Sequence, residues 1–534
     1  MADIVPIDHS REKAAYLGGV LKVLAALIAL GSLSLAFRAS EWVVDRPLSE
    51  DAFYCYAVSY NLAHGEGTTI DGSTLTNGFH PLFVFLAVPL FILAGNDKVL
   101  AVRLVFVLEW VLYTGTALLL GRVVRDFIAS DDEGRRSLTT WLAAVLYLSA
   151  GLVFLQHFNG LETGCLLFVY AATWRYYQVN LRNSHRHYCA LGALLGILVL
   201  TRVDAAFFVA ILCLKQILPG RKLRMRERAA RILELSFFSG LVSSPWWIYN
   251  LLGFHSLMPS SGRAEQAWAL SASRLRIMAV ALERGLAPWV YLTESHWDWT
   301  AGLAVRSLLM LAILAAGIRY RRALAGFFTH SASGSDEVRR TLEFAICLVA
   351  CMLALASWYA LSSWATHFYT RYLSPLSLVA AFLLAVAGAQ AFRRVPAWAG
   401  SGASVVLALP VLAGIAMLWG KPAMFGSNLA LRQQLELVSE CVPPHAVVAA
   451  GQSGTIGYFR KRVVNLDGKV NAAALAYQSR MWEYLPKVGA RWLCDCPSYV
   501  RQYLTAHPEA YGWKLVAQNG DFVLYHQEPA RGDR

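Results

Sequence analysis

The chain alternates long apolar stretches with short polar ones, a pattern typical of helices that cross a lipid bilayer. The first apolar stretch runs from about Ala15 to Phe37, close to the roughly 20 residues that a spanning helix needs. It is longer than the apolar part of a cleaved signal peptide, roughly 7–15 residues, which favours a retained span. Further apolar stretches begin near Pro81, Val99, Thr139, Leu161, Tyr188, Asp204, Ile232, Ala301, Thr341, Leu373 and Ser401.

The segment Pro81–Gly95 decides the topology, because its length suits an interfacial or re-entrant helix rather than a span. If it does not cross, the arginine-rich loops all fall on one side, which the positive-inside rule makes the cytoplasmic side. We therefore predict a multi-pass protein of the inner (plasma) membrane with about eleven transmembrane helices, a cytoplasmic N-terminus and an outer C-terminus. The arginine clusters lie within residues 122–136, 182–186, 221–231, 319–340 and 393–394.

Beyond residue 420 the apolar stretches give way to short segments whose pattern predicts strands, with a helix over Ser498–Ala506 between two of them. We therefore expect a transmembrane domain over residues 1–420, with a first outer loop over 38–98. Residues 421–534 should form an extracytoplasmic α/β domain, at the C-terminal end and periplasmic or extracellular. The expected strands are Ala446–Ala450, Arg462–Asn465, Ala490–Cys494, Lys514–Ala517 and Phe522–His526.

Three cysteines fall in this C-terminal domain, namely Cys441, Cys494 and Cys496. An oxidising compartment would permit a disulfide among them. Cys494 and Cys496 alternate on a strand and face opposite sides, so at most one of them can readily pair with Cys441. A metal site at the Cys-x-Cys pair is the alternative, although the sequence offers no second pair of ligands.

Composition agrees with a membrane protein, since 57% of the residues are hydrophobic and 16% are charged. A net charge of +13 would suit a nucleic-acid partner. The arginines, however, lie in short loops between apolar stretches, and no nucleic-acid motif or aromatic-basic groove accompanies them. We therefore expect membrane lipid around the protein and no nucleic acid.

The first outer loop contains an acidic pair, Glu50-Asp51. A carboxylate can take the proton of an attacking hydroxyl, and acidic residues can bind a divalent cation. A structural role is equally compatible with the pattern, because Ser49, Glu50 and Asp51 would cap the helix expected over Ala52–Leu62. Both roles remain open.

Two arginines are expected on the same outer side. Arg202 and Asp204 lie in a turn between two short spans, so the turn should lie below the outer surface and face a cavity. The two residues can pair with each other, or Arg202 can bind a phosphate through its planar fork. Arg371, beside His367 and Tyr372, can likewise bind a phosphate or anchor the chain at the membrane interface.

In their order along the chain, these motifs resemble those of the bacterial GT-C glycosyltransferases. The group includes relatives of protein O-mannosyltransferases, aminoarabinose transferases and the lipopolysaccharide-core sugar transferases of rhizobia. The resemblance covers nearly the whole chain, and the order of the motifs and their common side make the set specific. It rests on Glu50–Tyr54, Asn61–Gly67, Asp71-Gly72, Thr76–Leu82, Asn159–Thr163, Thr201–Asp204, His367–Pro375, Gly454–Tyr458 and Val464–Gly468.

The resemblance implies a mainly α GT-C fold and an enzyme that moves a hexose or pentose from a polyprenyl-phosphate donor to an envelope acceptor. The acceptor would be a glycolipid, a polysaccharide or a protein at the outer face. Many relatives carry Asp-Asp or Asp-Glu where this chain has Glu50-Asp51. We expect Asp51 to be the base, because Asp is the residue that the family uses, and Glu50 to orient a partner or bind a cation. Arg202 and Arg371 would bind the donor phosphate.

Several other residues are candidates for contacts with the substrate, the acceptor or a cation, and the motifs leave the use of a metal unknown. Each candidate also has a structural interpretation: a packed loop histidine for His80, a helix N-terminus for Glu162, and a plain Asn-Leu-Asp-Gly turn for Asn465 and Asp467. The candidates are His80, Glu162, Asp204, His367, Tyr372, Asn465, Asp467 and Lys469.

Two functions of other classes remain as alternatives. A transporter or lipid-linked-sugar flippase would show two matching halves, with broken helices and ionisable groups near the bilayer midplane. In this chain the polar motifs are expected at one end of the spans, and no halves match. The other alternative is a noncatalytic envelope assembly protein, which would bind its partners without transferring a sugar.

Overall fold

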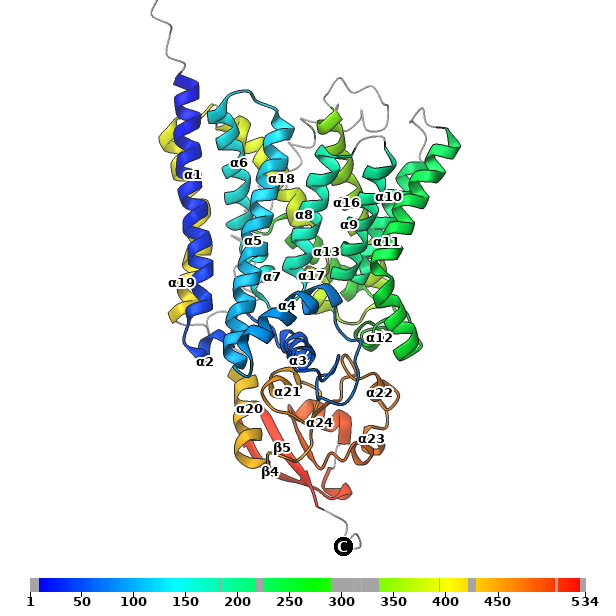
Figure 1. Cartoon of the computed structure of the whole chain (residues 1–534). Coiled ribbons are helices and arrows are strands. Elements are labelled where there is room, and N and C mark those ends of the chain that lie inside the picture. Colours follow the sequence, from blue (N-terminus) through cyan, green and yellow to red (C-terminus); the bar gives the residue numbers. More distant parts are fainter. Residues whose placement is uncertain are drawn as a thin grey trace, which may run out of the picture.

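The structure is a computed structural model of the chain that describes residues 9–181, 184–217, 224–289, 311, 318, 336–392, 394–420, 429–504 and 508–528. Helices form a bundle, and a small α/β domain lies against one end of it (Figure 1). The main bundle helices are α1 (His9–Ser34), α5 (Lys98–Ile128), α6 (Glu133–Leu148), α8 (Thr163–Val179), α9 (His185–Thr201), α10 (Ala206–Ile217), α11 (Met225–Phe254), α16 (Asp336–Ser362), α18 (Leu376–Ala391) and α19 (Ala397–Gly420).

The bundle helices pack against helices that are far apart in the sequence as well as against their sequence neighbours. Helix α1 lies along α6 and α19, α5 contacts both α6 and α8, and α9 packs against α11. Their facing side chains form one large apolar cluster that also includes residues of α3 (Ala52–Ala63) and α4 (Pro81–Ala94). Large apolar side chains such as Leu30, Leu252 and Val406 remain exposed on the outside of the bundle. This arrangement suits a bundle whose outer surface is covered by lipid.

Within the described residues, four helices are long and apolar enough to cross a membrane, or six if each of two bent pairs forms one span. The four are the helices around α1, α5, α16 and α19. Helices α8, α9, α10, α11 and α18 coincide with further predicted spans, so the prediction of about eleven spans is neither reached nor contradicted. The span expected near Ala301 lies outside the described residues. Helix α4 is short, as expected for Pro81–Gly95.

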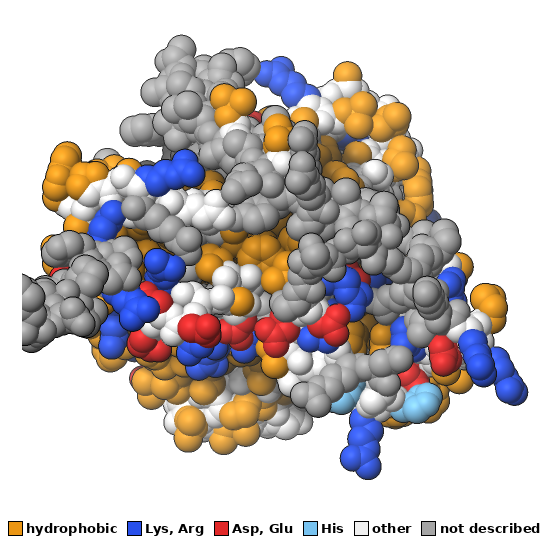
Figure 2. Space-filling view, turned by 90° about the horizontal axis from the view of Figure 1, so that it is seen from above, with side chains coloured by type: hydrophobic (Ala, Val, Ile, Leu, Met, Phe, Trp, Pro, Cys, Tyr) orange, Lys and Arg blue, Asp and Glu red, His pale blue; other side chains and the backbone are white. Residues whose placement is uncertain are grey.

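The described parts of the predicted arginine-rich loops, such as residues 122–136, lie at the end of the bundle away from the C-terminal domain (Figure 1). At this end, opposite charges form ion pairs in and beside the connection from α5 to α6, among them Arg125 with Asp126 and Arg136 with Asp131. Figure 2 shows Lys, Arg, Asp and Glu side chains mixed across the described part of this face. The predicted polar motifs lie at the opposite end. The two sets are therefore separated by the bundle, and their assignment to the cytoplasm and the outside stays a prediction.

The C-terminal segment forms a five-stranded mixed sheet in the order β2-β1-β3-β5-β4. Strands β1 to β3 are parallel, and β5 runs antiparallel to both β3 and β4. All five predicted strands and the predicted helix are confirmed, with ends that differ by up to two residues. They are β1 (Val448–Ala450), β2 (Val463–Asn465), β3 (Trp492–Asp495), β4 (Trp513–Asn519), β5 (Phe522–Gln527) and α24 (Pro497–Leu504).

Other helices of this segment were not predicted, including α20 (Leu429–Cys441), α21 (Gly454–Phe459), α22 (Ala472–Leu475) and α23 (Met481–Lys487). The expected disulfide is absent, because Cys441, Cys494 and Cys496 are free thiols in the structure. Cys494 lies in the core beneath the sheet, with Cys441 and Cys496 packed against it. All three therefore serve as packing residues.

The carboxyl ends of β1 and β2 point toward the bundle, and the loops that follow them touch α3. The Tyr54 hydroxyl donates to the Gly451 carbonyl (3.1 Å), and Asn465 Nδ2 donates to the same hydroxyl (3.3 Å). Two glycines allow the close approach: a Cβ atom on Gly454 would meet Glu50, and one on Gly78 would meet the Lys469 backbone. The domain is thus held on the first outer loop, and the loop after β2 is placed over the end of the bundle.

Candidate active site

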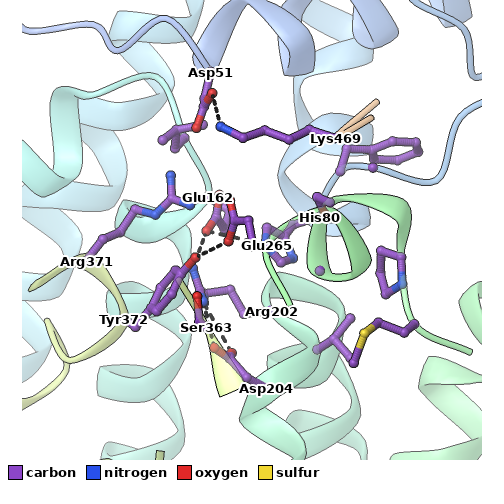
Figure 3. A pocket seen from close by; sticks show the side chains of 18 of the residues that line it. Asp51, His80, Glu162, Arg202, Asp204, Glu265, Ser363, Arg371, Tyr372 and Lys469 are labelled. Atoms are coloured by element: carbon purple, nitrogen blue, oxygen red, sulfur yellow. Dashed lines mark hydrogen bonds and ion pairs between the residues drawn. The ribbon is translucent and has the colours of Figure 1, made fainter. Parts of the chain in front are cut away.

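A cavity of about 380 Å³ lies between the end of the bundle and the C-terminal domain. Its wall comes from segments far apart in the sequence: the start of α3, the turn between α9 and α10, the α12 (Ser260–Ala264) region, the end of α16, α17 (Tyr369–Tyr372) and the loop after β2. Figure 3 shows Asp51 and Lys469 at one edge of the cavity and Arg202 and Asp204 at the other. The ionisable and hydroxyl groups that line it include Asp51, His80, Glu162, Arg202, Asp204, Glu265, Tyr359, Arg371, Tyr372 and Lys469.

Arg202 is the centre of a buried ion-pair network. It caps the C-terminus of α9, and its guanidinium donates to Glu162 Oε1 (2.7 Å) and to both Asp204 oxygens (3.1 and 2.6 Å). The Tyr359 hydroxyl also donates to Asp204 (2.6 Å), and the Arg202 guanidinium lies 4.5 Å from the ring centroid of Tyr372. Because both carboxylates are already bound to Arg202, the structural interpretation of the Arg202–Asp204 pair holds in this geometry.

Arg371 is placed differently, although it was predicted for the same task. Within the described residues it forms no ion pair, and its buried Nε atom has no hydrogen-bond partner. Its guanidinium lies over the rings of Phe368 (4.4 Å) and Tyr372 (5.5 Å). Aromatic rings hold the charge without consuming the donor atoms of the planar fork. Arg371 is therefore the arginine of this cavity that has hydrogen-bond capacity left for an anion.

Asp51 and Lys469 meet across the boundary between the bundle and the C-terminal domain. Lys469 Nζ lies 3.4 Å from Asp51 Oδ1, and both side chains are about one-fifth exposed (19% and 21%). Burial by itself would lower the pKa of Lys469, but Asp51, Asp467 and Glu265 raise it above its ordinary value. Lys469 is thus a stable cation next to a carboxylate that opens into the cavity.

Glu50 faces away from this cavity. Its Oε1 atom accepts a hydrogen bond from the backbone N–H of Gly454 at the start of α21. Burial raises the pKa of Glu50 to about 8, the Asp51 charge adds to the shift, and Lys469 opposes it. Glu50 therefore connects the C-terminal domain to the first outer loop. The two acids of the pair thus face different places: Asp51 lines the cavity, and Glu50 contacts the C-terminal domain.

The raised pKa of Glu50 makes a pH dependence of stability testable. Between its ordinary pKa of 4.5 and about 8, the folded protein holds a proton on Glu50 that the unfolded chain releases, so stability should fall as pH rises through this window. Glu50→Gln keeps a carbonyl for Gly454 and carries no charge, so it should remove this decline. Thermal melting in detergent from pH 5 to 9 measures it, and the melting temperature of the variant should exceed that of the wild type above pH 8.

Glu66→Gln is the control, because Glu66 pairs with Lys461 on the surface of the same loop region. It should retain the decline of the wild type. A Glu50→Gln variant whose melting temperature falls with pH as steeply as that of the wild type would contradict the proposed burial of a protonated Glu50.

His80 lies in the wall beside Glu162, with 3.6 Å between Nε2 and Glu162 Oε1. Burial lowers the pKa of His80, with Glu162 acting against the shift, so its ring is neutral at pH 7. Its Nδ1 atom is buried and has no hydrogen-bond partner among the described residues. Among all the residues that the structure describes, no three His, Cys, Asp or Glu side chains are grouped so that they could hold a metal ion. This donor set gives no support to a cation site.

The other predicted contacts are distributed over three places. Tyr372 lines the cavity and its hydroxyl donates to Glu265 (2.9 Å), whereas His367 lines a second, adjoining cavity. Asn465 and Asp467 do not line the cavity. Asn465 bonds to Tyr54, Gly451 and Ser453 at the domain boundary, and Asp467 accepts from the Lys469 backbone, so the turn interpretation describes both.

Two residues of the site were not predicted, Glu265 and Tyr359. Glu265 belongs to the segment that follows α11, and Tyr359 lies near the C-terminal end of α16. Burial raises the pKa of Glu265 although Lys469 and Arg371 oppose the shift. A usable signal existed for Glu265: it is an acidic residue on the expected outer side, close to the predicted loop His255–Pro259.

The arrangement combines three chemical capacities in one cavity. Asp51 offers a carboxylate that can accept a proton. Arg371 offers a planar fork that suits a phosphate, and Lys469 adds a second positive charge. Apolar side chains from Phe207, Met258 and Trp358 complete the wall, so the cavity can hold a ligand with one charged and one apolar part.

No family model matches the sequence, and a search of curated proteins returned no match. Solved structures do match over nearly the whole chain. ArnT from Cupriavidus metallidurans bound to undecaprenyl phosphate superposes with a TM-score of 0.58 at 11% identity, covering 96% of this chain and 98% of ArnT.

The oligosaccharyltransferase of Archaeoglobus fulgidus superposes in its apo form with a TM-score of 0.54 at 12% identity, covering 96% of this chain and 75% of that one. The same archaeal enzyme, AglB, in complex with an inhibitory peptide and a dolichol-phosphate gives a TM-score of 0.52 at 13% identity, with 96% and 74% covered. Both proteins are glycosyltransferases of the GT-C superfamily. The predicted fold is thereby confirmed: the chain is a multi-pass membrane protein with the GT-C fold and a small C-terminal sheet.

Proposed function

We propose that the protein is a membrane glycosyltransferase that moves a sugar from a polyprenyl-phosphate donor to an acceptor of the cell envelope. The observation that carries the proposal is that Asp51 and Arg371 line one cavity, at the end of the bundle that carries the C-terminal domain. The fold adds support, since ArnT binds undecaprenyl phosphate and AglB binds a dolichol-phosphate. The acceptor would be a glycolipid, a polysaccharide or a protein on the outer face of the inner membrane.

In the proposed reaction, Asp51 takes the proton of an acceptor hydroxyl while the hydroxyl oxygen bonds to the anomeric carbon of the sugar. The bond from this carbon to the phosphate oxygen breaks, and its electron pair leaves with the polyprenyl phosphate. A single displacement of this kind inverts the anomeric carbon, and no covalent nucleophile is invoked. Arg371 stabilises the charge that grows on the leaving phosphate.

The remaining polar residues would position these groups. Arg202 holds Glu162 and Asp204 in place, so we assign it a structural role rather than the direct phosphate contact first expected. Lys469 keeps Asp51 directed into the cavity until the acceptor arrives and adds positive charge near the leaving phosphate. The steps above are written without a metal ion, and the described residues include no group of three His, Cys, Asp or Glu side chains that could hold one.

The apolar part of the wall provides a route for the lipid. Met258 and Trp358 line the cavity and are also partly exposed (37% and 38%). Next to them, Leu257 and Trp268 are more than half exposed, and Trp268 stacks edge-on against Trp358. A polyprenyl chain lying across these side chains could remain in the bilayer while its phosphate reaches Arg371.

Arg371→Lys should raise the KM for the donor about 10- to 100-fold with a smaller effect on kcat. Lysine keeps the charge, but the variant loses hydrogen bonds from the planar fork to a charged phosphate. Initial rates of purified protein in detergent, with a polyprenyl-phosphate sugar as the varied substrate, measure the change. Arg432→Lys is the matched control, since Arg432 pairs with Glu436 on the surface of α20. An unchanged donor KM in Arg371→Lys would remove Arg371 from the donor site.

The proposed activity itself is tested by mass analysis of envelope glycans from cells with and without the protein, followed by transfer with the purified protein. Loss of one glycan residue in the deletion strain, and its restoration in vitro, is the expected result. Movement of the lipid-linked sugar across a liposome bilayer, with no transfer to any acceptor, would replace the proposal with a flippase.

A further inference from the structure

A second cavity of about 290 Å³ adjoins the first one. The two cavities share Leu161 and Arg371, which therefore form the partition between them. The rest of its wall comes from the segment just before α3, from α7 (Gly151–Phe158), from the C-terminal part of α13 (Ala272–Leu286) and from the turn before α17. Among the residues that line it, the reaction described above uses only Arg371.

The charge of the second cavity differs from that of the first. Arg46, Arg284, Arg371 and His367 line it, and no aspartate or glutamate does so among the described residues. The first cavity, in contrast, is lined by Asp51, Glu162, Asp204 and Glu265 as well as by cations. A concave wall with three arginines among its lining residues, and with no aspartate or glutamate among the described ones, favours an anion. The planar fork of arginine suits phosphates and carboxylates.

Unsatisfied polar atoms point to the same conclusion independently of charge. Arg371 Nε and Ser49 Oγ are both buried and have no hydrogen-bond partner among the described residues. Buried polar atoms are normally satisfied, so an unsatisfied pair in one cavity wall indicates a missing ligand or water. Gln156 and Asn159 add side-chain amides to this wall, which could bind the hydroxyl groups of a sugar.

The position of the second cavity relative to Asp51 indicates which substrate it would bind. Ser49 lines the second cavity and Asp51, two residues later, lines the first. The Ser49 backbone N–H donates to the Asn159 carbonyl (3.0 Å), which fixes the chain at this point. A molecule bound in the second cavity therefore contacts the segment that carries Asp51, on the side of Arg371 opposite to the cavity proposed for the donor.

We infer that the second cavity binds the acceptor, and that the acceptor is an acidic saccharide whose carboxylate or phosphate is held by Arg46 and Arg284. That the bound molecule is the acceptor rests on the proposed function, whereas the binding of an anionic sugar rests on the residues of this cavity. Arg371 would then contact both substrates across the partition. Such a site would select sugar chains that carry uronic acids or phosphate groups and would reject neutral chains.

Binding can be measured without any donor, by saturation-transfer NMR on the purified protein in detergent. The probes are two matched pairs, galacturonic acid with galactose and glucose 6-phosphate with glucose. The anionic member of each pair should bind about tenfold or more tightly, because hydrogen bonds to charged groups are the stronger ones. Arg46→Gln and Arg284→Gln should each remove this preference. Arg276→Gln should keep it, since Arg276 is exposed on α13 and does not line the cavity.

Equal binding of charged and neutral probes to the wild type would overturn the inference, and this comparison stands even if a variant fails to fold. Displacement of the anionic sugars by undecaprenyl phosphate would assign the cavity to the donor instead. Displacement in phosphatidylglycerol nanodiscs, but not in phosphatidylcholine ones, would assign it to a lipid headgroup. A protein that binds the acidic sugars as expected but transfers nothing would refute the proposed function and leave this site standing.

Discussion

Replacing Asp51 with asparagine should lower turnover by about 100- to 10,000-fold, the usual contribution of a general base. The variant should still fold, because the Asp51 side chain caps no hydrogen bond of α3 and its partner Lys469 keeps Asp467 and Glu265 nearby. The KM for the donor should change much less, since the phosphate is assigned to Arg371. The measurement is sugar transfer from a polyprenyl-phosphate donor by purified protein, with folding checked by thermal melting.

Asp71→Asn is the matched control for this variant. Asp71 lies in the same outer loop, and among the described residues its carboxylate bonds only to the local turn at Ser73 and Thr74. It should therefore leave turnover near that of the wild type. Normal turnover of Asp51→Asn together with an inactive Glu50→Gln would reverse the roles of the two acids. Full activity of both variants would move the catalytic site away from the first outer loop.

Arg202→Gln should destabilise the protein by about 3–5 kcal/mol, the usual cost of removing one partner from a buried ion pair. Arg202 is 2% exposed, and its loss leaves the carboxylates of Glu162 and Asp204 side by side without their cation. Activity should fall as well, because these carboxylates line the proposed donor cavity. Stability is measured by unfolding in a titration of denaturing detergent, and activity by the transfer assay at a temperature where the variant stays folded.

The same substitution at Arg432 provides the comparison. Arg432 and Glu436 form a surface pair one helical turn apart, each about half exposed (46%), and such pairs contribute at most about 1 kcal/mol. Arg432→Gln should therefore unfold nearly like the wild type. If Arg202→Gln is as stable as Arg432→Gln but has lost donor binding, then Arg202 binds the phosphate itself and the structural assignment made here is wrong.

Much of the fold could be predicted because its determinants are local. The length of an apolar stretch and its period indicate a helix. Apolar and polar residues that alternate along a short segment bounded by turn residues indicate a strand. The five strands and helix α24 were found in this way, as was the separation of the arginine-rich loops from the polar motifs. The short helices α21 to α23 were not predicted, because segments of four to seven residues carry too little periodicity to stand out. Helix α20 has 13 residues, so its length does not explain why it was not predicted.

The residues that line the cavity could be predicted in part, and their geometry could not be predicted. Asp51, Glu162, Arg202 and Arg371 were all expected near one another on grounds of motif order and side. Their partners depend on contacts between segments hundreds of residues apart, such as the approach of Lys469 to Asp51. Glu265 was not identified from the sequence, because a single acidic residue in a polar loop belongs to no motif. Its contact with Tyr372 depends on the tertiary fold.

The sequence by itself therefore determined the membrane bundle, the C-terminal sheet and the set of polar motifs, since each follows from residue type and spacing along a short segment. Only the tertiary structure decided how neighbouring groups divide their tasks. Asp51 opens into the cavity, whereas Glu50, one residue earlier, turns to Gly454 in the other domain. Arg202 forms ion pairs with two carboxylates, whereas Arg371 forms none among the described residues. The physical reason is that hydrogen bonding and charge compensation depend on which atoms lie within a few ångströms, and spacing along the chain does not specify this.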